Sequence, residues 1–203
     1  MKTLDPLIDD ARERLVARAK REGLVTVAYD VMDSPLGPLW IAVGPRGVVG
    51  IHYGASPDER EVARITATYG PAMLPDPSSC GRVESEIDQY FAHRRMSFDI
   101  EVDLTPLSPF QRRILAATAK VPYGEVTTYR EVARRAGNEQ ASRAAGGALG
   151  ANPIPIVVPC HRVVATDGSL GGYSGGLAAK RRLLELERGA ERVPAGGWPP
   201  SRR

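Results

Sequence analysis

The chain has 203 residues, of which 42% are hydrophobic and 25% are charged. This length fits one medium domain or two small ones, and the composition excludes a wholly disordered chain. Because no apolar run approaches the ~18 residues that span a bilayer and the acidic N-terminus lacks a signal-peptide pattern, we expect a cytoplasmic protein without a membrane segment.

The two halves of the chain differ in charge, although the overall balance is only +3. Residues 1–106 carry 12 Lys and Arg against 17 Asp and Glu, whereas residues 107–203 carry 15 against 7. A basic half of this kind favours a polyanion as partner. Cys80, Cys160 and three histidines are too few for a disulfide framework or a four-ligand zinc site, so we expect no metal and no cofactor.

The first half of the chain combines helical and strand patterns. Helix propensity and apolar periodicity predict three helices, over residues 7–22, 57–68 and 81–94. Apolar or alternating runs bounded by turn residues predict four strands, over residues 24–31, 39–43, 48–53 and 97–104. The first three strands are expected to form an antiparallel meander.

Two capping patterns mark helices in the second half. Ser108 with Gln111 predicts a helix from Pro109 to about Lys120, and Thr128 with Glu131 predicts a short helix that stops at Gly137. A further helix is expected over residues 139–149. Two short helices joined by a glycine turn in a basic half are typical of a helix-turn-helix.

These patterns together predict an α+β fold. We expect an N-terminal antiparallel-sheet lobe with helices and a C-terminal helical, winged helix-turn-helix lobe that carries Cys160. The predicted divisions are a helical extension, an α/β domain, a DNA-binding domain that contains Cys160, and a flexible tail, over residues 1–23, 24–104, 105–189 and 190–203.

The second helix of the helix-turn-helix consists mostly of small residues between Ala141 and Ala148, and Arg143 is its one long polar side chain. Such a helix has little with which to distinguish bases in a major groove. It would instead approach the backbone or the minor groove closely, with Arg143 entering the base stack. An equally good interpretation is that Gly146 and Gly147 only permit tight helix packing.

Cys160 lies near the end of an apolar, strand-like run over residues 152–162 that is stiffened by three prolines. A thiol attacks well at neutral pH only if its pKa is lowered or a base lies beside it, and His161 and Arg162 adjoin it. In extended backbone neighbouring side chains point to opposite faces, so a Cys160–His161 hydrogen bond would need a bend or a bridging water. The alternative is a cysteine that simply fills the core.

Glu187 lies on the apolar face of the last helix, three and four residues after Leu184 and Leu183. A carboxylate in that position needs a partner, and an imidazole would complete a thiol-imidazole-carboxylate relay. The alternative is a glutamate at the rim of the core.

Several motifs occur together with Pro159-Cys-His-Arg162 and Val163-Val164. They are Gly124-Glu-Val126, Tyr129, Arg143-Ala-Ala-Gly-Gly147, Asn152-Pro153 and Tyr173-Ser-Gly-Gly176. In this order and spacing, over nearly the whole chain, they resemble the O6-alkylguanine-DNA alkyltransferases, also called methylated-DNA–protein-cysteine methyltransferases.

The resemblance implies a repair reaction in which an alkyl group moves irreversibly from guanine O6, with thymine O4 as a further candidate, to Cys160. His161 would deprotonate the thiol through a water, and Glu187 would orient His161. Tyr129 would contact DNA near the flipped nucleotide and help to neutralise the departing guanine. Each molecule would act once, because nothing in the sequence would hydrolyse the thioether.

The same resemblance implies the binding residues. Arg143 would fill the gap left in the duplex, and Asn152 would join the recognition helix to the active-site segment. The expected DNA-binding residues are Thr128, Ser142, Arg143, Ala144, Gly146 and Arg162, and the expected pocket residues are Tyr129, Asn152, Val163, Tyr173, Ser174 and Gly175. The partner would be double-stranded DNA, bound in the minor groove by a monomer, largely without regard to sequence.

The chain departs from the family in three ways. Its first half lacks the cysteine and histidine set that binds zinc in some relatives, and residues 1–23 extend beyond the usual start. Gly150 and Gly172 stand where some relatives carry larger side chains, which bears on the range of O6 adducts accepted.

Other classes of function remain open from the residues. A non-catalytic winged-helix protein that binds DNA or lesions fits the basic half but leaves the Cys160–His161 pair unexplained. Alkyltransferase-like lesion sensors lack the acceptor cysteine that this chain has. A cysteine hydrolase would use the same thiol, imidazole and carboxylate, but no segment marks an oxyanion hole.

Overall fold

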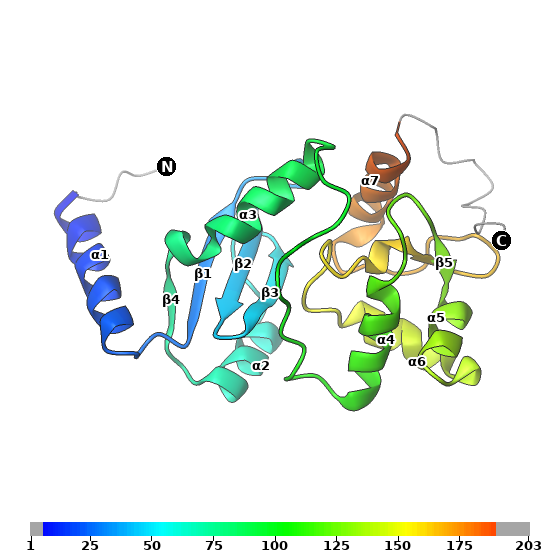
Figure 1. Ribbon diagram of the computed structural model, residues 1–203, viewed down its shortest axis with the longest axis horizontal. Coiled ribbons are helices and arrows are strands. Elements are labelled where there is room, and N and C mark those ends of the chain that lie inside the picture. The colour runs from blue at the N-terminus through cyan, green and yellow to red at the C-terminus, as the bar shows by residue number, and fades with distance from the viewer. Residues whose placement is uncertain (1–5, 190–203) are drawn as a thin grey trace.

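The computed structural model describes residues 6–189, which form two lobes lying side by side (Figure 1). Helix α1 (Pro6–Arg21) lies at the end of the molecule farthest from the C-terminal lobe (Figure 1). None of the helices in this part of the chain has the length and apolar character to cross a membrane. The predicted tail at residues 190–203 lies outside the described residues.

The N-terminal lobe is built on a four-stranded sheet. Its strands are β1 (Val27–Met32), β2 (Leu39–Gly44), β3 (Gly47–Tyr53) and β4 (Met73–Pro75), in the order β3-β2-β1-β4. The first three form the predicted antiparallel meander, and β4 runs parallel to β1. The sequence does not predict β4, because a three-residue strand is too short to show a periodic pattern.

The two faces of the sheet are covered by different helices, α2 (Glu59–Tyr69) and α3 (Pro77–Phe91). On β2, Leu39 and Ile41 belong to the main core with the buried residues of α3, whereas Trp40 and Ala42 pack with Ile65 of α2. This is the alternation that a strand covered on both sides requires. Figure 1 shows α2 and α3 on opposite sides of the sheet.

The predicted strand over residues 97–104 is wrong, because this segment is a connection with one isolated bridge between Val102 and Val48. Its apolar side chains do alternate inward and pack against the core. Its backbone bonds to β3 around this bridge, where the Val48 N–H donates to the Glu101 carbonyl at 2.9 Å and the Asp103 N–H donates to the Val48 carbonyl at 2.8 Å. The Asp99 N–H instead donates to the side chain of Glu86, at 2.8 Å from Oε2. The alternation therefore identified which side chains face the core, but not the partner of the backbone.

Helices of the C-terminal lobe start where the capping residues predict. Helix α4 (Pro109–Ala119) follows Ser108, whose capping box with Gln111 is complete. Helix α5 (Tyr129–Arg135) follows Thr128, whose hydroxyl accepts from the Glu131 N–H at 3.2 Å. The Glu131 carboxylate pairs with two arginines of α5, Arg134 and Arg135.

The helix expected over residues 139–149 consists of two pieces, a 3₁₀ turn η1 (Glu139–Ala141) and helix α6 (Ser142–Gly150). Helices α5 and α6 pack against each other as the two helices of the helix-turn-helix. The lobe is completed by η2 (Cys160–Arg162), by the parallel pair β5 (Thr127–Thr128) and β6 (Val163–Val164), and by α7 (Gly176–Arg188).

The lobes are joined at the loop that precedes Cys160. The Ile51 N–H of β3 donates to the Pro153 carbonyl at 2.8 Å. Residues from both lobes also belong to one main hydrophobic core. The N-terminal sheet therefore supports the segment that delivers the cysteine.

Candidate active site

The segment over residues 152–162 is not the extended run that the sequence predicts. It turns repeatedly, and η2 places Cys160, His161 and Arg162 in one 3₁₀ turn. Backbone bonds close these turns, from Cys160 N–H to the Val158 carbonyl at 2.8 Å and from Arg162 N–H to the Pro159 carbonyl at 3.0 Å. The bend turns both His161 and Arg162 into the protein interior.

One residue of this segment has an uncommon backbone conformation. Ile156 has φ 73°, in the left-handed region that a β-branched residue rarely adopts, and its side chain is fully buried. Such a conformation costs about 1–3 kcal/mol, which the surrounding packing must offset. The cysteine is therefore delivered by a segment whose shape the core imposes.

Cys160 is 5% exposed, and its sulfur accepts a hydrogen bond from Asn152 Nδ2 at 3.1 Å. Burial raises the pKa of the thiol to about 11, although the Asn152 bond and the nearby charge of Lys180 act in the opposite direction. At neutral pH the resting thiol is thus protonated. It needs a base to become a nucleophile.

His161 is fully buried, and its Nε2 lies 2.8 Å from Glu187 Oε1. Burial lowers the pKa of the imidazole, so the resting ring is neutral at pH 7. Because an ionised carboxylate only accepts, Nε2 carries the ring proton and Nδ1 is left as the acceptor. Nδ1 is buried and has no hydrogen-bond partner among residues 6–189.

Glu187 is the centre of a buried polar network. Burial raises the pKa of its carboxyl, but the hydrogen bonds and charges of His161 and Arg162 outweigh burial and lower the pKa to about 2. The Tyr90 hydroxyl donates to Oε1 at 2.7 Å, and the Gly124 N–H donates to Oε2 at 3.1 Å. The carboxylate is therefore ionised and held from several sides, which fixes the imidazole orientation.

Arg162 is not the DNA contact that the sequence predicts, because it is 6% exposed and faces inward. Its Nε and Nη2 bind the two oxygens of Glu187, each at 2.8 Å, and Nη1 donates to the Val121 carbonyl at 2.6 Å. A guanidinium occupied in this way holds the carboxylate and is not offered to a phosphate.

Lys180 is a buried cation that the sequence analysis did not single out. Its Nζ donates to the Val163 carbonyl at 2.6 Å and to the Leu170 carbonyl, and it lies 5.8 Å from the centroid of the Tyr129 ring. Burial lowers the pKa of the amine to about 8. Lys180 thus ties β6 to the loop before Tyr173 and places a cation near Cys160.

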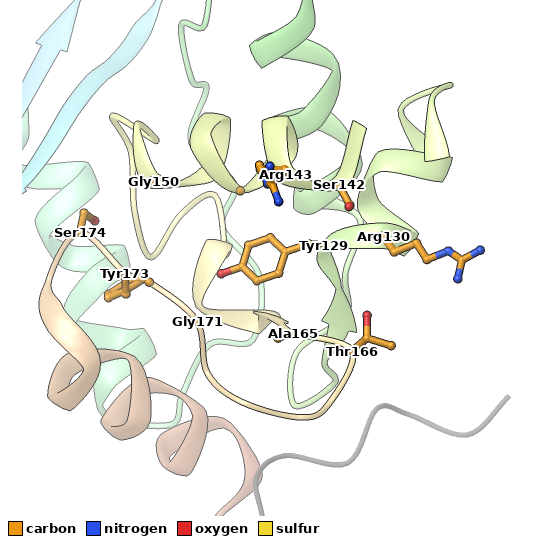
Figure 2. Close-up of a pocket in the computed structure, with 12 residues that line it drawn as sticks. Tyr129, Arg130, Ser142, Arg143, Gly150, Ala165, Thr166, Gly171, Tyr173 and Ser174 are labelled. Atoms are coloured by element: carbon orange, nitrogen blue, oxygen red, sulfur yellow. The ribbon is translucent and has the colours of Figure 1, made fainter. Parts of the chain in front are cut away.

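A cavity of about 660 Å³ opens between α6 and the loop over residues 165–174. Figure 2 shows Tyr129 in its centre, below Arg143 of α6, with Tyr173 and Ser174 on the opposite loop. A methyl group on Gly171 would lie 2.5 Å from the Tyr129 hydroxyl, so this glycine lets the loop approach the ring. Burial raises the pKa of Tyr129, which keeps its hydroxyl protonated.

The predicted residues fall into distinct places around this cavity. Those that line it are Tyr129, Ser142, Arg143, Gly146, Tyr173 and Ser174, together with Gly150 and Gly172. Thr128, Ala144, Val163 and Gly175 do not line it, and Asn152 borders a neighbouring cavity instead. Val163 is fully buried and offers its carbonyl to Lys180.

Tyr90, which donates to Glu187, and Tyr53, whose hydroxyl lies 2.7 Å from that of Tyr173, were also missed. Local sequence does not reveal them, because both come from the N-terminal lobe. Lys180 could have been found. It precedes Leu183 and Leu184 by three and four residues and Glu187 by seven, so helical spacing places it on the same apolar face.

The fold and site define a two-lobed α+β protein in which a helix-turn-helix borders a buried cysteine, histidine and glutamate. Residues 27–104 match the family described as "6-O-methylguanine DNA methyltransferase, ribonuclease-like domain", and residues 109–189 match its "DNA binding domain". The chain belongs to the methylated-DNA–protein-cysteine methyltransferase family.

Individual relatives agree with this assignment. The methylated-DNA–protein-cysteine methyltransferase of Mycobacterium bovis is 40% identical over 172 residues, covering 83% of this chain and 96% of the relative. The crystal structure of the Mycobacterium tuberculosis O6-methylguanine methyltransferase is 39% identical, with a TM-score of 0.70 over 83% of this chain and 96% of that one. The Mycobacterium tuberculosis OGT has been crystallised with DNA; it is 37% identical with a TM-score of 0.70, over 79% of this chain and 92% of that one.

Proposed function

We propose that this protein repairs alkylated double-stranded DNA by moving the alkyl group from guanine O6 to the sulfur of Cys160. The observation that carries the proposal is the arrangement of three groups. The protonated, buried thiol of Cys160 lies in the same 3₁₀ turn as His161, and Nε2 of this imidazole is bonded to the ionised carboxylate of Glu187. The names of the relatives and the DNA complex of one of them support the same reaction.

The transfer follows from the groups present. The thiol proton passes to His161 Nδ1 through a water, because Nδ1 is the free acceptor of the ring and no direct bond joins it to the sulfur among the described residues. The sulfur then forms a bond to the alkyl carbon while the bond from that carbon to O6 breaks. The departing guanine takes up a proton from the Tyr129 hydroxyl, whose raised pKa keeps it protonated. The proton held by His161 then returns through water to Tyr129, so the thiol proton is in effect passed to the guanine.

The target oxygen of a paired guanine lies inside the stack, so the nucleotide must rotate out of the duplex, at a cost of about a few kcal/mol. The cavity between α6 and the loop over residues 165–174 would receive the extruded base. Arg143 is exposed on α6 at the rim of this cavity and would enter the gap left in the stack. DNA would lie with its minor groove against the small residues of α6.

The reaction would occur once per molecule. The product is a thioether, and its C–S bond has no leaving group comparable to guanine. His161 and Glu187 form a base suited to a thiol proton but not to displacement at an alkyl carbon. We therefore expect no turnover and no cofactor.

Intact-mass measurement after mixing with a duplex that contains one O6-methylguanine tests the proposal. The wild type should gain one methyl group in place of a proton, on the peptide with Cys160, and the yield should saturate at one per molecule. Cys160→Ser should gain nothing yet bind DNA with unchanged affinity. An unmodified wild type would favour a non-catalytic DNA or lesion binder, and continued turnover would exclude the single-use reaction.

A further inference from the structure

Tyr53, at the end of β3 in the N-terminal lobe, reaches into the site of the C-terminal lobe. Its hydroxyl lies 2.7 Å from the Tyr173 hydroxyl, and the two rings meet edge to face with centroids 5.8 Å apart. The Tyr173 ring in turn stands at 89° to the His161 ring, with centroids 6.4 Å apart. A contact series therefore runs from the N-terminal sheet through Tyr53 and Tyr173 to the candidate base.

The ring of Tyr53 fits closely against the loop that carries Tyr173. A Cβ added at Gly175 would lie 2.6 Å from the Tyr53 ring, which leaves no room for even a methyl group. The backbone of β3 is fixed nearby, because Ile51 N–H donates to the Pro153 carbonyl. Tyr53 is thus held on a rigid strand and presses on both the side chain and the backbone of the loop.

Two cavities meet at this contact. Tyr173 lines the cavity of about 660 Å³ beside α6, and Tyr53 lines a second cavity of about 550 Å³ between the lobes. Gly150 and Ser174 border both cavities. Asn152, which bonds the sulfur of Cys160, faces the second one. Tyr53 and Tyr173 therefore lie at the boundary where the cavity beside α6, if it were enlarged, would join the cavity between the lobes.

We propose that Tyr53 is a positioning and specificity-determining residue for alkyl transfer, which fixes Tyr173 as the wall between the acceptor site and the inter-lobe cavity. The proposal rests on the proposed function for its substrate. A small O6 adduct fits beside the fixed Tyr173 ring. A large aryl adduct needs more room, and the fixed ring limits that room. The pKa of Tyr53 is raised by burial and by the charge of a Cys160 thiolate, so its hydroxyl stays protonated and available to Tyr173 during the reaction.

Four variants separate the hydroxyl from the ring. Tyr53→Phe and Tyr173→Phe each remove the shared hydrogen bond, the double variant removes both hydroxyls, and Tyr53→Ala removes the ring that supports Tyr173. Single-turnover transfer from duplexes with O6-methylguanine and O6-benzylguanine should slow roughly fivefold in Tyr53→Phe. The double variant should be no slower than the slower single variant, because one bond is lost in each. Tyr53→Ala should raise the benzyl-to-methyl rate ratio by about tenfold.

A second readout does not depend on DNA repair. Iodoacetamide should modify the Cys160 peptide faster in Tyr53→Ala than in the wild type, because removal of the ring opens the site from the inter-lobe side; the separate peptide with buried Cys80 serves as an internal reference. Tyr29→Phe, on β1 of the same sheet, is the matched control and should behave as wild type in both assays. Thermal melting confirms that each variant is folded.

The outcomes separate the two proposals. A wild type that transfers no alkyl group refutes the proposed function, while the iodoacetamide rates still decide whether Tyr53 holds Tyr173 in place as the wall of the site. Wild-type transfer rates in Tyr53→Phe, additive losses in the double variant, or an unchanged iodoacetamide rate in a folded Tyr53→Ala would each overturn the role of Tyr53. If Tyr53→Ala does not fold, the two hydroxyl variants and their double variant decide it.

Discussion

Asn152 and Cys160 are joined by a hydrogen bond that makes the sulfur part of a buried turn. Asn152 Nδ2 donates to Sγ at 3.1 Å and to the Val158 carbonyl at 2.9 Å, and Oδ1 accepts from the Ile154 N–H at 3.1 Å. One amide therefore holds the backbone of the turn and also stabilises negative charge on the sulfur.

Asn152→Ala should weaken both the turn that precedes Cys160 and the stabilisation of negative charge on the sulfur. Val158 and Ile154 would each lose a buried partner, which costs about 1–3 kcal/mol per group. The pKa of Cys160 would rise further, because the lost bond is one that lowers it. We expect a less stable protein by urea unfolding and a slower transfer whose pH dependence moves to higher pH. Asn138→Ala, which removes an exposed cap at η1, is the control; a transfer rate equal to that of the wild type would contradict the assigned bond.

Glu187→Gln should lower stability at neutral pH and change its dependence on acid. The pKa of Glu187 is lowered from its ordinary value of 4.5 to about 2 in the fold, because the hydrogen bonds and charges of His161 and Arg162 outweigh burial. A depressed pKa gives stability that is present above the unfolded value and is lost as the pH falls toward the folded value. At pH 7 this amounts to about 3 kcal/mol for the buried carboxylate.

Urea unfolding of wild type and Glu187→Gln at pH 7 and at pH 3 measures this effect. The variant should be less stable at pH 7, and the difference between the two proteins should shrink as the pH falls from 4.5 toward 2. If the difference in unfolding free energy stays constant across this pH range, the ionised carboxylate of Glu187 is not its cause.

Arg143→Ala should slow transfer from a duplex severely while leaving reaction with free O6-benzylguanine almost unchanged. An inserted side chain offsets the cost of unstacking, which arises only when a base is extruded from a duplex. Single-turnover rates at one salt concentration measure both reactions. Arg134→Ala, at an exposed position of α5, controls for the loss of a positive charge. Equal slowing of both substrates would place Arg143 in the structure of the site instead.

Binding to undamaged duplexes should depend strongly on salt and weakly on sequence. Phosphate contacts release counterions, and α6 presents few side chains that could distinguish bases. We expect affinity to fall at least roughly tenfold between about 50 and 200 mM salt. Titration of several unrelated duplexes measures this, and a tight preference for one short sequence would instead favour a transcriptional regulator.

The sequence predicted those features that depend on local periodicity or capping. Ser108 and Thr128 mark the starts of α4 and α5. The spacing of Leu183, Leu184 and Glu187 predicted a carboxylate on the buried face of α7. Each of these signals is contained within one turn or two of helix, so neighbouring residues suffice to read it.

Other features depend on contacts that sequence spacing does not contain. Three prolines made residues 152–162 resemble a stiff strand, whereas they support a series of turns that ends in η2. Tyr90 reaches Glu187 across 97 positions, and Tyr53 reaches Tyr173 across 120. Arg162 illustrates the same difficulty, because a charged side chain two residues after the cysteine could face either DNA or the protein interior. It faces the interior because Glu187 lies there to pair with it.

The Tyr90–Glu187 contact also has a consequence for how the chain unfolds. If the N-terminal lobe opened alone, Glu187 would lose the Tyr90 hydroxyl, Tyr173 would lose Tyr53, and the loop before Cys160 would lose its bond to Ile51. If the C-terminal lobe opened alone, the core residues of the N-terminal lobe that pack against it would be exposed to water. Partial opening from either end therefore meets a large penalty, and heat should melt the two lobes together in one cooperative transition.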